Sequence, residues 1–369
     1  MNAIRIIVSG GGTGGHIFPA IAIANALRLI GFEVDILFVG AEGKMEMEKV
    51  PAAGYRIVGL PVVGIERRIF SKKNLLAPLK LLRSIRKAAA IVGDFAPAVV
   101  IGVGGYASAP TLWVAQRRGI PTLIQEQNSY AGLTNKLLAR RAKKVCVAYE
   151  GMERFFPATK IVFTGNPVRQ DLSSVAPLRD EAIAYFELEP DKKTILVLGG
   201  SLGARTLNRS VLHHMAAIAA ARSVQLIWQT GELYRQDIQR QLTGCDYGNV
   251  KVMSFIKRMD YAYAAADVVI SRAGASAISE LCVVQKPCIL VPSPNVAEDH
   301  QTSNALALVS KNAALLVTDA EAIQRLIPTA LQLVGNEEKK QELSRSIGEL
   351  AVRNAAERIA EEVVKIIDN

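Results

Sequence analysis

Short runs of apolar, often β-branched residues alternate with stretches of helical spacing along residues 1–165. These runs lack an alternating polar face, which is typical of strands buried on both sides in a parallel sheet covered by helices. The predicted strands are Ile4–Val8, Val34–Val39, Arg56–Leu60, Val99–Val103, Pro121–Gln125 and Lys144–Val147. Helices are expected at about 17–30, at 78–92 and after Tyr106.

The same pattern restarts after residues 165–169, a segment with Gly and Pro where we place a hinge. The second set of predicted strands is Thr194–Leu198, Val224–Trp228, Val250–Ser254, Asp267–Ile270 and Pro287–Val291. Residues 337–369 have the pattern of one charged amphipathic helix. We therefore predict two doubly wound, Rossmann-like α/β domains facing across a cleft, at 1–165 and 166–345, with a C-terminal helix at 346–369 that packs near the interdomain region.

A glycine-rich loop follows the first predicted strand, with five glycines among residues 10–15. Bare backbone N–H groups at the start of a helix suit a phosphate or a crowded sugar. The spacing Gly10-x-Gly12-x-x-Gly15 also matches the dinucleotide fingerprint, a pattern of low specificity. His16 lies in the first turn of the following helix, where a general base, a phosphate donor and a helix-capping side chain are all open interpretations.

Two further polar segments follow neighbouring strands of the first domain. Residues 102–108 form a second glycine turn at the carboxyl end of a strand, and Gln125–Asn128 follows the next strand. Carboxyl ends of parallel strands share one edge of a sheet, so both segments are expected near His16. Glu126 is thus a second candidate base, although a buried Glu satisfied by helix N-termini is an equally good interpretation.

In the second domain, a turn of small residues at 272–276 leads into a helix that carries Glu280. Free N–H groups at such a helix start can hold a diphosphate, and a carboxylate can accept hydrogen bonds from two ribose hydroxyls. An ordinary exposed helical Glu is the alternative. His300 and Gln301 follow the next strand, where they can contact sugar hydroxyls. The alternative is that this segment only caps a helix, through Asp299 and Asn304.

The formal net charge of +10 lies in the N-terminal half, because residues 1–165 hold 22 Lys and Arg against 10 Asp and Glu. This excess predicts an anionic partner there. Residues 66–87 contribute eight of these cations among apolar residues: Arg67, Arg68, Lys72, Lys73, Lys80, Arg83, Arg86 and Lys87. With Leu82, Ile85, Ala89 and Val92 as the buried helix face, the remaining apolar residues predict a basic-apolar patch for an anionic membrane surface. A solvated helix face is the alternative, and nucleic acid is not expected because aromatic platforms are nearly absent.

Several features bear on the compartment and on cofactors. No signal-peptide pattern begins at Met1, and the four cysteines form no C-x-x-C pair, so we expect no export and buried, reduced thiols. The uncharged stretch at 95–116 is broken by Gly and Pro, which predicts a strand, a turn and a helix rather than a membrane span. No Asp-x-Asp or metal-ligand spacing occurs, so neither a metal nor another cofactor is expected.

Seven motifs together resemble the MurG family of bacterial peptidoglycan N-acetylglucosaminyltransferases. In chain order they are GGTGGHIFPA (11–20), GGYAS (104–108), EQNSYAGLTNK (126–136), TGNPVR (164–169), GGSLGAR (199–205), SRAGASAISEL (271–281) and HQTSNA (300–305). The resemblance covers nearly the whole chain and implies a GT-B fold. It also implies a peripheral enzyme on the cytoplasmic side of the bacterial inner membrane.

The same resemblance implies the roles of particular residues. Those expected to bind UDP-N-acetylglucosamine are Thr13, Gly14, Gly15, Asn128, Arg169, Ser201, Ile256, Ala275, Ser276, Glu280 and Gln301. Gly104, Gly105 and Tyr106 are implied on the acceptor side, with His16 or Glu126 as the catalytic base. The role of His300 stays open, because many relatives have a second Gln there.

The implied reaction transfers N-acetylglucosamine, with inversion, to the C4 hydroxyl of undecaprenyl-diphosphate-linked muramyl-pentapeptide (lipid I), giving lipid II and UDP. A related glycosyltransferase with another lipid acceptor and a noncatalytic UDP-sugar or glycolipid binding module are the alternatives. A nicotinamide oxidoreductase fits less well, because it expects an acidic residue at the end of the second strand. Glu33 and Asp35 lie at the start of that strand, which leaves only Glu42 in the loop beyond it.

Overall fold

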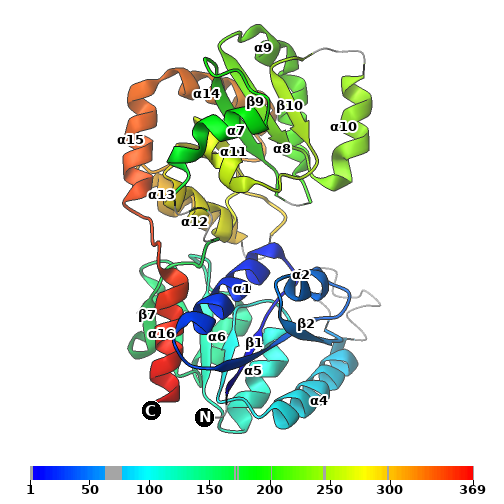
Figure 1. Cartoon of the computed structure of the whole chain (residues 1–369), viewed down its shortest axis with the longest axis vertical. Coiled ribbons are helices and arrows are strands. Elements are labelled where there is room, and N and C mark those ends of the chain that lie inside the picture. Colours follow the sequence, from blue (N-terminus) through cyan, green and yellow to red (C-terminus); the bar gives the residue numbers. More distant parts are fainter. Residues whose placement is uncertain are drawn as a thin grey trace. The chain divides into compact units, whose positions relative to one another are not determined.

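The computed structural model describes residues 3–62, 77–169, 172, 174–200, 202–243, 247–296 and 299–368. It divides into two compact units (Figure 1). The first is Met1–Arg169 together with Asn354–Asn369, and the second is Gln170–Arg353. Each unit holds one parallel sheet between helices, which confirms the predicted pair of doubly wound α/β domains.

The first unit has a seven-stranded sheet in the order β3-β2-β1-β4-β5-β6-β7, with every neighbouring pair parallel. Its strands are β1 (Ile4–Ser9), β2 (Val34–Ala41), β3 (Arg56–Leu60), β4 (Val99–Gly102), β5 (Thr122–Glu126), β6 (Lys144–Val147) and β7 (Ile161–Phe163). Six of them were predicted within two residues at each end. The three-residue β7 was not, because so short a run has no readable period.

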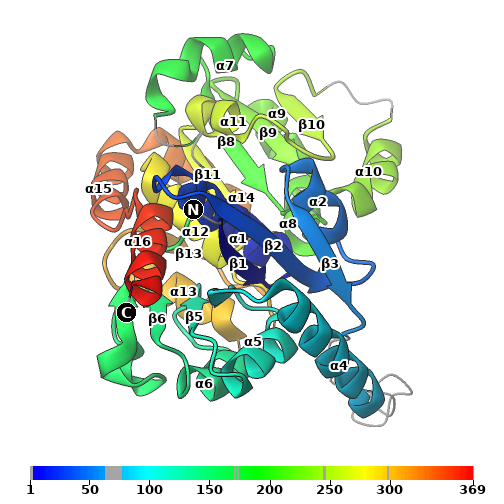
Figure 2. The ribbon, with the colours of Figure 1, turned by 60° about the horizontal axis from the view of Figure 1, so that its bottom comes forward.

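Helices cover both faces of this sheet. Alternate residues of β1 point to opposite sides: Ile6 and Val8 belong to one apolar core, and Ile7 belongs to the other. The first core includes α1 (Gly14–Leu29), α2 (Glu46–Ala52) and α16 (Ala355–Ile367). The second includes α4 (Ala77–Phe95), α5 (Ser108–Arg117) and α6 (Leu133–Ala139), and Figure 2 shows α4 beside α5.

The single helix expected over 337–369 is two helices. The first, α15 (Glu337–Gly348), belongs to the second unit, whereas α16 packs on α1 in the first unit. The buried apolar stripe of α16 consists of Ala356, Ile359, Ala360 and Val363. This stripe at helical spacing supplies the first core with a segment that is far from it in sequence.

The second unit has a six-stranded parallel sheet in the order β10-β9-β8-β11-β12-β13. Its strands are β8 (Lys193–Leu198), β9 (Val224–Gln229), β10 (Val250–Met253), β11 (Val268–Ser271), β12 (Cys288–Leu290) and β13 (Leu315–Leu316). The helices are α7 (Arg179–Tyr185), α8 (Arg205–His213), α9 (Met215–Ala220), α10 (Arg235–Leu242), α11 (Met259–Ala265), α12 (Ala275–Val284), α13 (His300–Val309) and α14 (Ala322–Gly335). Short 3₁₀ helices among the described residues are Met152–Arg154 and Ala158–Lys160 in the first unit, and Ala176–Leu178 and Glu232–Tyr234 in the second.

The fold also bears on the predictions for the cysteines, for the uncharged stretch at 95–116 and for the buried face of α4. Cys146, Cys282 and Cys288 are buried free thiols, and burial raises the pKa of Cys146 and of Cys282 to about 12, whereas Cys245 lies outside the described residues. The uncharged stretch contains β4 and α5, as predicted, and within the described ranges no helix is both long and apolar enough to cross a membrane. The buried face expected for α4 was wrong at Leu82, which is 46% exposed.

Candidate active site

The glycine-rich loop lies at the topological switch point of the first sheet. Strands β1 and β4 are neighbours there, with β2 on one side and β5 on the other. Ligands of open α/β sheets bind at such a point, beyond the carboxyl ends of the strands. The loop after β1, the turn after β4 and the segment after β5 therefore lie along one edge, as the sequence predicted.

The first two of these loops touch backbone to backbone. The N–H of Gly11 donates to the Gly104 carbonyl at 3.3 Å. A Cβ added to Gly105 would lie 2.2 Å from the carbonyl oxygen of Gly11, and Gly105 also has a φ of +83°. Contact this close is possible only without side chains, so these glycines fix the relative position of the two loops.

His16 lies at the junction of these loops. Its Nδ1 is 3.1 Å from the Gly11 carbonyl oxygen and 3.2 Å from the Thr13 hydroxyl. A carbonyl only accepts, so this geometry favours a proton on Nδ1, and a neutral ring then has its lone pair on Nε2. The ring packs against Gly104, where an added Cβ would lie 3.0 Å from Nε2.

Glu126 has a different environment. The residue is only 3% exposed, and its carboxylate accepts four hydrogen bonds. Asn128 donates through its backbone N–H at 3.1 Å and its amide at 3.3 Å, and Gly132 N–H and the Asn135 amide donate at 3.2 and 2.9 Å. Burial raises the pKa of Glu126 above its ordinary value, while these four bonds oppose the shift. The carboxylate thus ties together the segment between β5 and α6.

The remaining predicted residues of the first unit lie at the same edge or beyond β7. Gly14 and Gly15 begin α1, which has no acidic residue in its first turn, and Tyr106 is 55% exposed. Arg169 places its guanidinium carbon 6.0 Å from the centre of the Phe18 ring on α1. Arg169 is therefore close to the first turns of α1.

In the second unit, β8 and β11 form the switch point. The loop after β8 packs against the loop after β9, because a Cβ added to Gly203 would lie 2.2 Å from the Thr230 carbonyl oxygen. Gln229 joins this loop to Ile256, donating to the Gly200 carbonyl at 2.8 Å and accepting from the Ile256 N–H at 3.2 Å. Ser201, in the same loop, lies outside the described residues.

Glu280 and Gln301 lie on adjacent helices of the second unit. Ala275 and Ser276 form the start of α12, where the N-cap Gly274 offers no side-chain hydrogen bond. Glu280 accepts a hydrogen bond from the hydroxyl of Tyr263 at 3.0 Å, and Tyr263 is 1% exposed. Gln301 accepts from the Ser293 N–H at 2.8 Å. Both predicted polar side chains are thus positioned by bonds within their own unit.

Sequence reasoning missed three residues that organise these sites: Glu46, Gln229 and Tyr263. Glu46 is 1% exposed and accepts hydrogen bonds from the backbone N–H groups of Gly12 and Ala41. The only sequence signal was a polar or charged residue at or shortly after the end of a predicted strand, which applies to Gln229 and Glu46, whereas Tyr263 lies inside α11 and had no such signal. Neighbouring residues of the same kinds share that signal, so it did not single these out.

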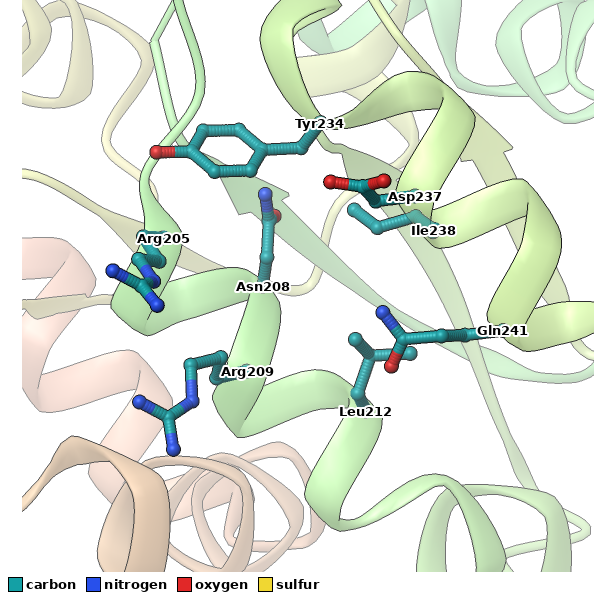
Figure 3. A pocket seen from close by; sticks show the side chains of 8 residues that line it. All are labelled: Arg205, Asn208, Arg209, Leu212, Tyr234, Asp237, Ile238 and Gln241. Carbon is teal, nitrogen blue, oxygen red and sulfur yellow. The ribbon is translucent and has the colours of Figure 1, made fainter.

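The second unit also has a hollow of about 490 Å³ between α8 and α10 (Figure 3). Its lining residues are Arg205, Asn208, Arg209, Leu212, Tyr234, Asp237, Ile238 and Gln241. Asn208 is already paired, donating to the Thr230 carbonyl at 2.9 Å and accepting from the Trp228 indole at 3.0 Å. Of the residues predicted to bind substrate, none that the structure describes lines this hollow. Among the described residues, no cluster of three or more His, Cys, Asp or Glu is placed to hold a metal ion.

Comparison with known proteins assigns both sheets to one class of enzyme. Residues 6–147 match the glycosyltransferase family 28 N-terminal domain, and residues 194–359 match the glycosyltransferase family 28 C-terminal domain. The chain is therefore a family 28 glycosyltransferase with a GT-B fold. Relatives that match the chain over its whole length, and one solved structure, show which family of these glycosyltransferases it belongs to.

The UDP-N-acetylglucosamine--N-acetylmuramyl-(pentapeptide) pyrophosphoryl-undecaprenol N-acetylglucosamine transferase of Parabacteroides distasonis is 59% identical over 368 residues, covering 100% of both chains. The transferase of the same name from Bacteroides fragilis is 58% identical, covering 99% of this chain and 96% of the relative. The crystal structure of Acinetobacter baumannii MurG matches with a TM-score of 0.75 at 28% identity, covering 98% of this chain and 99% of that one. The chain belongs to the MurG family, which confirms the resemblance found in the seven motifs.

Proposed function

We propose that this protein transfers N-acetylglucosamine from UDP-N-acetylglucosamine to the C4 hydroxyl of lipid I, forming lipid II and UDP. The observation that carries this proposal is the 59% identity, across both units, to a relative whose name states the donor sugar and the muramyl-pentapeptide acceptor. The positions of the predicted residues, at the carboxyl edges of the two sheets, support it.

His16 is the general base in this proposal. With the proton on Nδ1, Nε2 takes the proton of the acceptor C4 hydroxyl as that oxygen bonds to the anomeric carbon. The bond from the anomeric carbon to the UDP oxygen breaks, its electron pair leaves with UDP, and the configuration inverts to a β-1,4 link. Glu126 has a positioning role instead, because four donors already hold its carboxylate. Gly104, Gly105 and Tyr106 keep the acceptor-side role that the family implies.

Donor binding rests mainly on the second unit. Glu280, held by Tyr263, accepts hydrogen bonds from the ribose hydroxyls, and the first turn of α12 offers N–H groups to the diphosphate. Ile256, Gln301 and Ser201 complete this part of the proposal. From the first unit, Thr13, Gly14, Gly15, Asn128 and Arg169 keep the donor roles that the family implies. Arg169 and the helix N-termini stabilise the negative charge that develops on UDP.

The reaction is tested with radiolabelled UDP-N-acetylglucosamine, with and without lipid I in detergent. Label should enter a lipid-extractable product, with equimolar UDP, only when lipid I is present. Undecaprenyl phosphate and undecaprenyl-diphosphate without the muramyl-peptide serve as matched acceptors. Labelling of one of these in place of lipid I would indicate a different lipid acceptor, and binding of UDP-sugar without turnover would indicate a noncatalytic module.

We further propose that the enzyme is peripheral on the cytoplasmic face of the membrane and binds anionic lipid through α4. Leu79, Leu81 and Leu82 are 58%, 50% and 46% exposed, and Arg83 and Arg86 are exposed beside them. These five residues form the α4 patch. Arg67, Arg68, Lys72 and Lys73 of the predicted basic run lie outside the described residues, and Lys87 pairs with Glu42 at 2.8 Å. Apolar side chains among cations are typical of a surface that binds anionic membranes.

Replacing Arg83 and Arg86 together by Ala is expected to weaken binding to phosphatidylglycerol vesicles about 30-fold at low salt, since each cation near such a surface contributes about 1 kcal/mol. Co-sedimentation measures the effect, which should shrink as salt screens the charges. The matched control replaces Arg235 and Arg240 of α10, which removes the same charge from the second unit. An equal loss of vesicle binding in both variants would show that binding depends on net charge alone. That result would contradict a role for the α4 patch.

A further inference from the structure

Glu46 and His16 are joined through a single peptide unit, the one between Gly11 and Gly12. The N–H of this peptide donates to both carboxylate oxygens of Glu46, at 3.0 Å each. Its carbonyl oxygen lies 3.1 Å from Nδ1 of His16. One amide plane therefore has the carboxylate at its donor end and the imidazole at its acceptor end.

The protein is built closely around this carboxylate. Glu46 is the first residue of α2, is 1% exposed, and also accepts from the Ala41 N–H at 2.9 Å. A Cβ added to Gly11 would lie 2.1 Å from its Oε1, and one added to Gly40 would lie 2.7 Å from its Cγ. Glycine at both positions leaves the space that the buried side chain fills.

We infer that Glu46 is a positioning residue for His16, acting through the Gly11–Gly12 peptide. This inference rests on the proposed role of His16 as the base. Glycines restrict the orientation of a peptide plane less than any other residue, so the plane needs an external partner to hold it. The charged acceptor at the N–H end fixes the plane and polarises it, which strengthens the carbonyl as an acceptor for Nδ1–H. Nε2 is thereby kept as the ring's basic nitrogen.

The tautomer of His16 provides a test that does not depend on activity. The chain has four histidines, so ¹⁵N-histidine labelling gives a small set of ring signals, and His16→Asn identifies those of His16. In spectra recorded at about pH 8.5, about two units above the ordinary pKa of a histidine, the native protein should show His16 with its proton on Nδ1. Glu46→Ala should reduce the population with the proton on Nδ1, and Glu46→Gln, which keeps an acceptor but loses the charge, should reduce it less.

Kinetics supply the second readout. Glu46→Gln is expected to lower kcat about 10-fold, by analogy with the low end of the loss seen when the outer partner of a metal-ligating imidazole is removed, while KM for UDP-N-acetylglucosamine changes less than twofold. In a His16→Asn background the same substitution should cost nothing more, because the group it positions is already gone. Glu48→Gln, the same change at a 79%-exposed side chain on α2, is the matched control.

Each failure has its own signature. An unchanged His16 tautomer in Glu46→Ala, or one that shifts in Thr13→Val instead, overturns the inference while leaving the base proposal intact. Additive losses in the double variant also overturn it, because they indicate a merely structural role. A normal kcat in His16→Asn contradicts the base proposal itself, whatever the tautomer shows. Glu46→Gln nearly preserves side-chain volume, so it keeps the test open if Glu46→Ala does not fold.

Discussion

His16→Ala should lower kcat about a thousandfold while KM for UDP-N-acetylglucosamine stays within a few fold. A positioned general base contributes about 10²–10⁴ to a rate, and alanine offers no lone pair to take the C4 hydroxyl proton. The contacts of Nδ1 with Gly11 and Thr13 are local, so their loss should have little effect on the donor-binding groups of the second unit. Initial rates with saturating lipid I measure kcat, and calorimetric titration with UDP measures donor affinity.

Two variants make this result specific. His16→Asn has an amide that can donate to the Gly11 carbonyl but cannot act as a base, so it should be as slow as His16→Ala. His213→Ala, at an exposed histidine of α8, should keep the native rate. If His16→Asn keeps a normal kcat and Glu126→Gln loses it while remaining folded, then Glu126 is the base.

Glu280→Ala should weaken UDP binding about a thousandfold. Hydrogen bonds to a charged group contribute about 1.5–3 kcal/mol each, so two ribose hydroxyls on one carboxylate account for about 4 kcal/mol. Tyr263 holds the carboxylate from a fully buried position, which reduces the entropy lost when the ribose binds. Calorimetric titration with UDP measures the loss, and Glu338→Ala, at an exposed glutamate of α15, is the control that should bind normally.

The nucleotide itself provides the sharper test of the ribose contact. Native protein should bind 2′-deoxy-UDP less tightly than UDP, whereas Glu280→Ala should discriminate much less between the two. The losses of affinity caused by the variant and by the deoxy sugar should be strongly non-additive. The variant removes the acceptor and the deoxy sugar removes the donor of the same hydrogen bond. If Glu280→Ala still prefers UDP by the native factor, the carboxylate does not contact the 2′-hydroxyl.

Much of the fold was predictable because its strands are buried on both faces. Uninterrupted apolar runs such as those of β1 and β8 identified parallel sheets, and nearly all longer strands were placed within a residue or two. The short strands β7 and β13 were missed, and Leu82 of α4 was assigned to the wrong face. The two strands are too short to show a period, and α4 has more leucines near its start than its buried face can hold, so neighbouring elements decide the outcome.

The candidate site residues also fall into those that the sequence indicated and those that only the structure revealed. The glycine loops and His16 stood out because their residue types are unusual just beyond a buried strand. Glu280 stood out because it lies one to two turns into the helix that follows a turn of small residues. The buried residues that hold these groups in place did not stand out. Glu46, for example, cannot be told from Glu48 by sequence, because both are glutamates in the same short helix. Their exposure differs because only Glu46 faces the Gly11–Gly12 peptide.

By itself, the sequence determined the class of fold, the family and the chemistry available at the strand ends. These follow from periodicity and from glycine motifs whose backbone requirements are local. Only the tertiary structure decided that α16 completes the core of the first unit, that four donors hold Glu126, and that one peptide links Glu46 to His16. These outcomes depend on contacts between residues that are far apart in the sequence. No local pattern of residues encodes such contacts.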